Sequence, residues 1–247
     1  MKKTFFIPVV LILLVLTLPF FTLAQTTSKH RVAIAIHGGA SNIKKLNLTP
    51  NQEKAYKDTL AIALQAGYEI LKNGGSSLDA VQAAVNVMEN SPLFNAGRGS
   101  VLTHDGTVEM DAAIMNGKTL KAGAITGVKT IKNPINAARM VMDSSKFVFL
   151  SGTGAEQFAR EKGIELVDSS YFVTAYRQEQ LRRILTGDTL PATHTDTSGM
   201  ITPIDISGRQ DEKFGTVGCV AVDQFGNLAA ATSTGGIVNK EYNRIGD

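Results

Sequence analysis

The sequence predicts an α/β fold in which short strands and amphipathic helices alternate along the chain. Three observations lead to this prediction. Runs of β-branched residues end in turn-forming residues, as in residues 31–39. Other segments place apolar residues three or four positions apart, as in Leu78, Val81 and Val85. The composition, 43% hydrophobic and 19% charged, is that of an ordinary globular protein.

Helices are predicted where a capping signal or an apolar period of 3.6 marks them. Residues 49–52 read Thr-Pro-Asn-Gln, which combines an N-cap threonine, a proline at the first helical position and a glutamine three residues after the cap. This helix should reach about Lys72, because the Asn-Gly-Gly at residues 73–75 ends it. The other predicted helices cover residues 78–88, 133–142, 156–162 and 175–185.

Strands are predicted at residues 31–36, 101–102, 108–115, 122–128 and 147–150. Near the end of the chain, two apolar runs at 217–222 and 228–232 flank five turn-forming residues, a pattern typical of a β-hairpin. Because short turns join neighbouring strands, we expect mainly antiparallel pairing.

The first 24 residues predict a cleaved signal peptide. Two lysines precede an uncharged apolar run over residues 5–23, which leads into Thr22-Leu23-Ala24, with small residues at the positions that a signal peptidase inspects. The alternative is an uncleaved membrane anchor, since the run approaches spanning length. With cleavage after Ala24, we expect a secreted or periplasmic protein. Farther along, residues 186–213 are rich in Thr, Ser, Asp, Gly and Pro without any period, which predicts a mobile linker.

Charge and motif searches exclude several classes of protein. There are 25 Lys+Arg against 22 Asp+Glu, and two of the lysines lie in the signal segment, so the mature chain is near neutral and has no basic field for nucleic acid. The lone Cys219 excludes an intrachain disulfide framework. Residues 117–119 suggest a phosphate loop, but Ala112 stands where its first glycine would be.

A Gly-Thr pair between the linker and an apolar strand is a candidate nucleophile site. A threonine hydroxyl is a weak nucleophile that needs a base. If Thr216 became an N-terminus, its own α-amine, with a pKa of roughly 7.7–8.0, could serve. Gly215 before it would accept the strained backbone that self-cleavage requires. Taken alone, a Gly-Thr pair before a strand is usually just a turn, and the residues by themselves favour that interpretation.

Seven segments in fixed order carry a resemblance to a known family. They read IHGGA (36–40), SPLFNAG (91–97), MDAAIMNG (110–117), LKAGA (120–124), GTVG (215–218), GNLAAATSTGG (226–236) and NRIGD (243–247). From His37 to Asp247 the chain resembles the plant-type L-asparaginase/isoaspartyl peptidase family of N-terminal-nucleophile hydrolases with a threonine nucleophile.

The resemblance implies a four-layer αββα sandwich, two stacked sheets flanked by helices. It also implies a hydrolase of β-aspartyl amide bonds, in isoaspartyl dipeptides and L-asparagine, that matures by self-cleavage. Residues 25–215 would then form the α-chain part, ending in the linker at 186–215, and residues 216–247 the start of the β-chain part. The family pattern implies an (αβ)2 homodimer of cleaved protomers.

The same resemblance assigns roles to individual residues. The chain would cut itself between Gly215 and Thr216, and the freed Thr216 would be the catalytic nucleophile. Thr234 matches a second threonine that polarises its hydroxyl. Arg244 matches the residue that grips the substrate α-carboxylate, for which a guanidinium fork is suited. Asp247 matches the partner of the substrate α-ammonium.

No catalytic cofactor is implied, but the loop at residues 88–98 resembles the family's sodium loop. There, main-chain carbonyls hold a structural monovalent ion. The alternative is a plain helix-to-strand connection. The matching positions are Met88, Glu89, Ser91, Phe94, Ala96 and Arg98.

The chain departs from the family at its end. The family continues beyond the position of Asp247 through several strands and a Thr-Gly segment that forms the oxyanion hole, so we expect a C-terminally truncated piece. Two other functions stay open: a glycosylasparaginase, and an inactive secreted relative that never matures. The residues 233–236 and Gly215 favour the peptidase branch.

Overall fold

The computed structural model describes residues 31–39, 48–187 and 215–246. Three predictions lie outside the described residues: the signal peptide over residues 1–24, the role of Asp247, and nearly all of the linker. Among the described residues, no helix combines the length and the apolar character that crossing a membrane requires.

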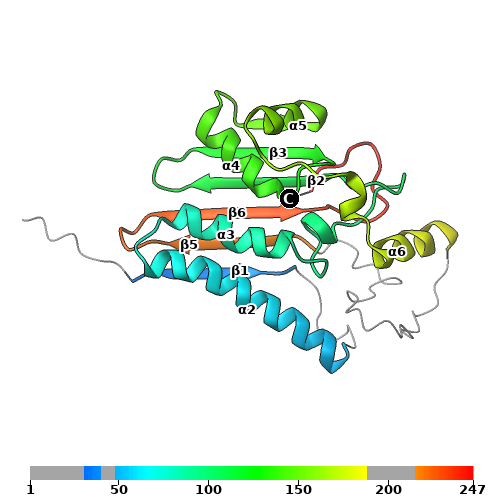
Figure 1. Cartoon of the computed structure of the whole chain (residues 1–247), viewed down its shortest axis with the longest axis horizontal. Coiled ribbons are helices and arrows are strands. Elements are labelled where there is room, and N and C mark those ends of the chain that lie inside the picture. Colours follow the sequence, from blue (N-terminus) through cyan, green and yellow to red (C-terminus); the bar gives the residue numbers. More distant parts are fainter. Residues whose placement is uncertain (1–30, 40–47, 188–214, 247) are drawn as a thin grey trace, which may run out of the picture.

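A six-stranded mixed sheet forms the centre of the described structure (Figure 1). Its order is β1-β5-β6-β2-β3-β4, so the hairpin β5–β6, which comes last in the sequence, lies between β1 and β2 in the sheet. The strands are β1 (Ala33–His37), β2 (Met110–Asn116), β3 (Ala122–Val128), β4 (Phe149–Ser151), β5 (Val217–Val222) and β6 (Leu228–Thr234).

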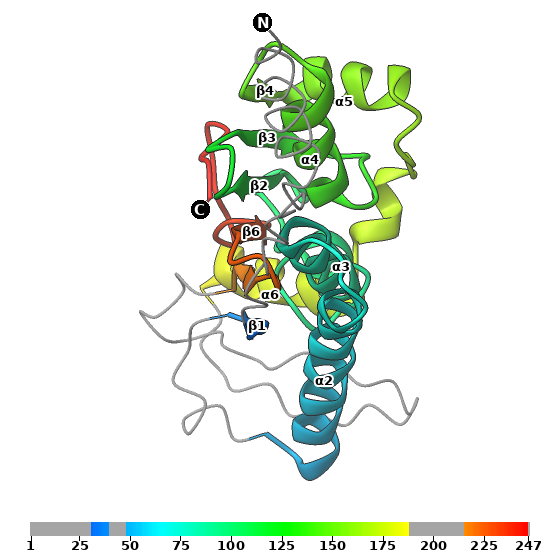
Figure 2. The same ribbon diagram turned by 90° about the vertical axis from the view of Figure 1, so that its left-hand side faces the viewer.

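Helices lie along one face of this sheet (Figure 2). Helix α3 packs against β5 and β6, and α4 against β2 and β3, while α2 runs beside α3 at the β1 edge. Apolar side chains fill the space between these layers, which buries Val81 and Met88 of α3 completely. The helices are α2 (Pro50–Lys72), α3 (Ser77–Glu89), α4 (Pro134–Ser144), α5 (Gly152–Glu161) and α6 (Ala175–Thr186).

Local capping accounts for the helix whose bounds the sequence predicts best. Thr49 is the N-cap of α2 and accepts the Gln52 N–H at 3.3 Å, while the Gln52 side chain accepts the Thr49 N–H at 3.0 Å. This capping box satisfies two main-chain donors that a helix leaves unpaired at its start. The predicted helix from residue 50 to Lys72 is therefore confirmed, as is the β5–β6 hairpin.

One local prediction, the strand at residues 101–102, is wrong. Val101 and Leu102 are not a strand; both are buried, but their main-chain groups bond to the Asn95 side chain and to Asn239 instead of to a neighbouring strand. The expectation of mainly antiparallel pairing is confirmed. The exception is β4, which pairs in parallel with β3 because the connection between them contains the whole of helix α4 and so returns the chain in the same direction.

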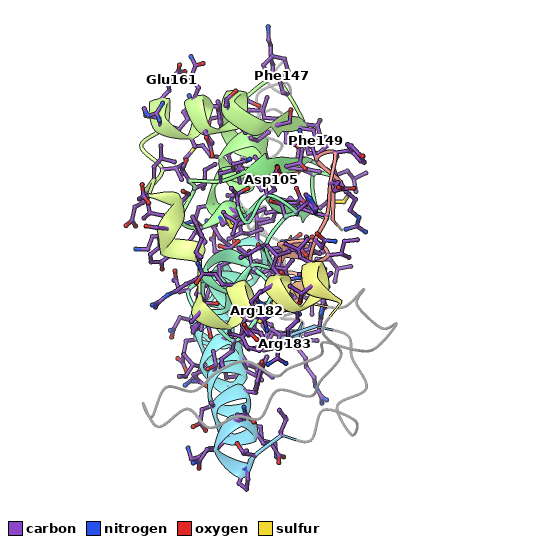
Figure 3. The ribbon with its side chains drawn as sticks, turned by 90° about the vertical axis from the view of Figure 1, so that its right-hand side faces the viewer. Asp105, Phe147, Phe149, Glu161, Arg182 and Arg183 are labelled. Atoms are coloured by element: carbon purple, nitrogen blue, oxygen red, sulfur yellow. The ribbon has the colours of Figure 1, made fainter. Side chains whose placement is uncertain are left out.

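The second face of the sheet carries apolar side chains that no described element covers. Successive side chains of a strand point to opposite faces, so exposed and buried residues alternate. In β5, for example, Val220 is 54% exposed while its neighbours Cys219 and Ala221 are buried. Figure 3 shows Phe147 and Phe149 at the outer edge of the sheet. The large exposed side chains on this face are Met115, Phe149, Val220 and Leu228.

The α/β class is confirmed. The described residues supply one sheet and one helical layer of the expected four-layer sandwich, and the uncovered apolar face is the kind of surface that a second sheet packs against.

Candidate active site

The β5–β6 hairpin brings the two predicted catalytic threonines together. Thr216 directly precedes β5, and Thr234 ends β6. The antiparallel register pairs Val217 with Ser233, which places the two threonines opposite each other. The Thr216 hydroxyl donates to the Thr234 Oγ1 at 3.1 Å, and Thr234 is 1% exposed. Two residues 18 positions apart therefore share one hydrogen bond at the same end of the sheet.

The hydroxyl oxygen of Thr234 accepts two hydrogen bonds. In addition to the Thr216 hydroxyl, it accepts the Gly236 N–H at 2.9 Å. These two bonds fix the Thr234 hydroxyl beside the Thr216 hydroxyl, which needs a base before it can attack a carbonyl carbon.

Asn95, to which the sequence analysis assigns no role, lies directly against the predicted cleavage site. A Cβ placed on Gly215 would be 2.7 Å from Asn95 Nδ2 and 2.9 Å from its Cγ, so only a glycine fits there without movement. Gly39 also lies close to Gly215, with 3.4 Å between its own hypothetical Cβ and the Gly215 Cα. The only sequence signal for Asn95 is its place in the SPLFNAG segment.

Asn95 is itself held rigidly. Its Nδ2 donates to the Gly236 carbonyl at 2.7 Å, and its Oδ1 accepts the Val101 N–H at 2.9 Å. Its main-chain carbonyl accepts the Gly235 N–H at 3.1 Å. One asparagine therefore connects the loop before β2, the turn after β6 and the Gly215 position.

The loop that contains Arg244 returns to the end of β6. Gly246 packs on the Thr234 side chain, since a Cβ placed on Gly246 would be 2.5 Å from Thr234 Cγ2. Arg244 is exposed, and its Nη1 lies 3.5 Å from where a Gly236 Cβ would be. The structure thus brings the Arg244 loop beside the two threonines, while Asp247 lies outside the described residues.

The predicted sodium loop is a compact turn rich in crowded carbonyls. Gly97, with φ +52°, could not carry a Cβ without meeting the main chain of Glu89, and Gly99 could not without meeting the Pro92 carbonyl at 2.7 Å. In the described part of the chain, no group of three or more His, Cys, Asp or Glu side chains could hold a metal ion. A site here would depend on main-chain oxygens, which suit an alkali cation.

The side chain of Glu89 has a structural role that the sequence analysis does not assign. The carboxyl is fully buried and accepts the Ser233 hydroxyl at 2.6 Å and the Ile135 N–H at 3.0 Å. Burial raises the pKa of Glu89 to about 7, and the bonds from Ser233, Ile135 and Asn133 only partly offset that effect. Glu89 thus joins the end of β6, one residue before Thr234, to the start of α4.

Cys219 takes no part in this chemistry. It lies in β5 with its side chain under the helical layer and is 3% exposed. Burial raises the pKa of its thiol to about 12, so the thiolate that reacts as a nucleophile is absent at neutral pH.

Comparison with known proteins agrees with this geometry. A family model described as Asparaginase matches residues 30–247. The chain is 46% identical over 236 residues to a putative isoaspartyl peptidase/L-asparaginase of Dictyostelium discoideum, and this alignment covers 87% of this chain and 67% of that protein. It is 47% identical over 217 residues to an isoaspartyl peptidase of Escherichia coli strain K12 (88% and 65%) and 43% identical over 218 residues to a mouse isoaspartyl peptidase/L-asparaginase (87% and 60%). The chain therefore spans about two thirds, or somewhat less, of the length of these relatives.

Proposed function

The chain belongs to the asparaginase family whose model matches residues 30–247, and from this we propose that it hydrolyses β-aspartyl amide bonds after cutting itself between Gly215 and Thr216. Isoaspartyl dipeptides and L-asparagine are the proposed substrates. The single observation that carries the proposal is the hydrogen bond of 3.1 Å from the Thr216 hydroxyl to Thr234. Thr216 directly precedes β5, so cleavage there would make it the first residue of the second chain.

Maturation needs no group from outside the chain except water. The Thr216 oxygen attacks the Gly215 carbonyl carbon, the peptide C–N bond breaks, and an ester to Thr216 replaces it. The nitrogen keeps its proton, takes up the hydroxyl proton and becomes the free amine of Thr216. Water then hydrolyses the ester and leaves a carboxylate on Gly215. Asn95 and Gly39, which both lie close to Gly215, support this route because they restrict where its carbonyl can lie.

Turnover would repeat this chemistry on the substrate. The Thr216 amine accepts the hydroxyl proton, the oxygen attacks the β-carbonyl, and the leaving amine departs with that proton. Water then releases aspartate from the acyl-enzyme and restores the threonine. Thr234 accepts a hydrogen bond from the Thr216 hydroxyl in the resting site, which orients it for this cycle. The family needs no catalytic cofactor for these steps.

Asparagine and β-linked aspartyl peptides share a free α-carboxylate and a free α-amine, so one clamp can hold both. Arg244 is the proposed partner of the carboxylate and Asp247 of the amine. What supports Arg244 is its loop, which returns to Thr234 through Gly246. The guanidinium fork would form two parallel bonds with a carboxylate.

Three further proposals depend on the family resemblance. Main-chain oxygens of the loop at residues 88–98 would hold a structural sodium ion, which the crowded carbonyls of that loop fit. Cleaved protomers would assemble as an (αβ)2 homodimer. The N-terminal segment would direct the protein out of the cytoplasm, as a secreted or periplasmic protein.

The test is the maturation and activity of the full-length gene product. We expect two bands on a denaturing gel, with the second chain beginning at Thr216, and release of aspartate from isoaspartyl dipeptides. Thr216→Ala should give one uncut, inactive chain, while the control Thr232→Ala, in the same strand as Thr234, should be cut and active. A second chain that begins elsewhere would overturn the nucleophile assignment, and glycosyl-asparagine as the better substrate would favour glycosylasparaginase.

A further inference from the structure

Beneath the Arg244 loop lies a buried carboxylate for which the proposed mechanism has no use. Asp111 belongs to β2 and is 5% exposed. The β2–β6 register places it directly opposite Thr234. A buried aspartate at this position needs hydrogen-bond donors around it, because an uncompensated charge is costly away from water.

The neighbouring strand supplies two of these donors through a β-bulge. The register between β2 and β3 shifts at Asp111, so that Thr126 and Gly127 both lie opposite it. The Thr126 hydroxyl and the Gly127 N–H, at 2.9 Å, both donate to Asp111 Oδ1. Gly127 has φ +64°, a conformation that favours glycine. Such bulges often redirect groups beside a functional site.

The other carboxylate oxygen reaches the Arg244 loop. Asp111 Oδ2 accepts the Gly246 N–H at 2.7 Å, and the Lys240 ammonium lies 4.0 Å away as a charge partner. Residues 241–245 are all exposed, so this bond is a fixed point between an otherwise solvent-facing loop and the sheet. Gly246 in turn packs on the side chain of Thr234.

We propose that Asp111 is a positioning residue that sets the distance between the substrate-binding Arg244 loop and the Thr216–Thr234 pair. This inference rests on the proposed function, because it assumes that Arg244 holds the substrate. The effect of Asp111 on the Arg244 loop passes through its hydrogen bond from the Gly246 main chain.

Asp111→Asn tests the idea because the three groups that hydrogen-bond to Asp111 are all donors. An asparagine has one acceptor oxygen and an NH2 group, and because two of the three donors lie at the β3 bulge, we expect the oxygen to stay there and the NH2 group to face the Gly246 N–H. Releasing Gly246 should raise KM for an isoaspartyl dipeptide by about 10-fold or more, the size of effect expected when a hydrogen bond to a charged group is lost. The kcat should stay within about 3-fold, and self-cleavage should proceed.

Asp223→Asn is the matched control. Asp223 is 2% exposed and accepts the main-chain N–H groups of Phe225 and Asn227, but it lies in the turn at the other end of the hairpin, about 20 Å from the threonines. It should lower the thermal midpoint as Asp111→Asn does and leave KM unchanged. An unchanged KM in Asp111→Asn, or an equal rise in both variants, would overturn the proposal.

Amide hydrogen exchange separates this inference from the proposed function. In the unsubstituted full-length protein, the Gly246 amide should exchange at least about 100-fold more slowly than an unprotected amide. That protection should disappear in Asp111→Asn and persist in Asp223→Asn. If the protein shows this exchange pattern but hydrolyses no β-aspartyl substrate, the proposed function is rejected and the bond between Asp111 and Gly246 is retained. If the Gly246 amide exchanges as fast as an unprotected amide in the unsubstituted protein, the positioning role of Asp111 is rejected. This result does not depend on whether Asp111→Asn folds.

Discussion

Gly215→Ala should slow self-cleavage strongly, because the added methyl group enters space that Asn95 already fills. The new Cβ would lie 2.7 Å from Asn95 Nδ2 and 2.9 Å from Cγ, where ordinary contacts need about 3.5–4.0 Å. Either Asn95 or the scissile bond must therefore move by about 1 Å.

The magnitude follows from what holds Asn95 in place. Its amide is fixed by bonds of 2.7 Å to the Gly236 carbonyl and 2.9 Å from the Val101 N–H. Overpacking of this kind costs about 1–3 kcal/mol, and loss of one hydrogen bond adds about 1 kcal/mol. A total of about 2–4 kcal/mol in the approach of Thr216 to the Gly215 carbonyl corresponds to cleavage about 30-fold to about 1000-fold slower.

The assay is a time course of the uncut band on a denaturing gel, taken from freshly folded full-length protein. Gly154→Ala is the control, because a Cβ on Gly154 meets nothing within 4 Å, and its cleavage rate should match that of the unsubstituted protein. Cleavage of Gly215→Ala at the unsubstituted rate would refute the argument, since it would mean that Asn95 does not constrain the carbonyl.

Two other predictions concern the substrate clamp and the chain as it stands. Arg244→Ala should weaken substrate binding by about 2–5 kcal/mol while self-cleavage stays normal, because cleavage needs no α-carboxylate; a normal KM would contradict the assignment. Residues 1–247 expressed alone should be poorly soluble, since Val220 and Met115 lie on an apolar sheet face that no described element covers, and a soluble product with a cooperative thermal transition would disprove this expectation.

The family, the α/β class and the main elements were predictable because their signals are local or occur in a fixed order. The Thr49 capping box lies within four residues of sequence and needs no tertiary contact to form. The β5–β6 hairpin is similar, since its turn and two apolar runs are contiguous. The position of Thr216 beside Thr234 follows from that hairpin once its register is known.

Long-range contacts decided the rest. Val101 and Leu102 have the composition of a strand, but Asn95 and Asn239 take up their main-chain groups, so no ladder forms. The contact of Asn95 with Gly215 joins residues more than a hundred positions apart, and no local pattern indicates it.

The sequence by itself determined where most helices and strands lie, because propensity, capping and turn residues act over a few positions, and its resemblance to a family indicated which residues are the candidates for the chemistry. Only the tertiary structure decided what holds those residues in place. The carboxylates of Glu89 and Asp111 reach Ser233 and Gly246 across 144 and 135 positions of sequence. A buried acid must find its donors wherever the fold brings them, and that choice is made by packing rather than by neighbouring residues.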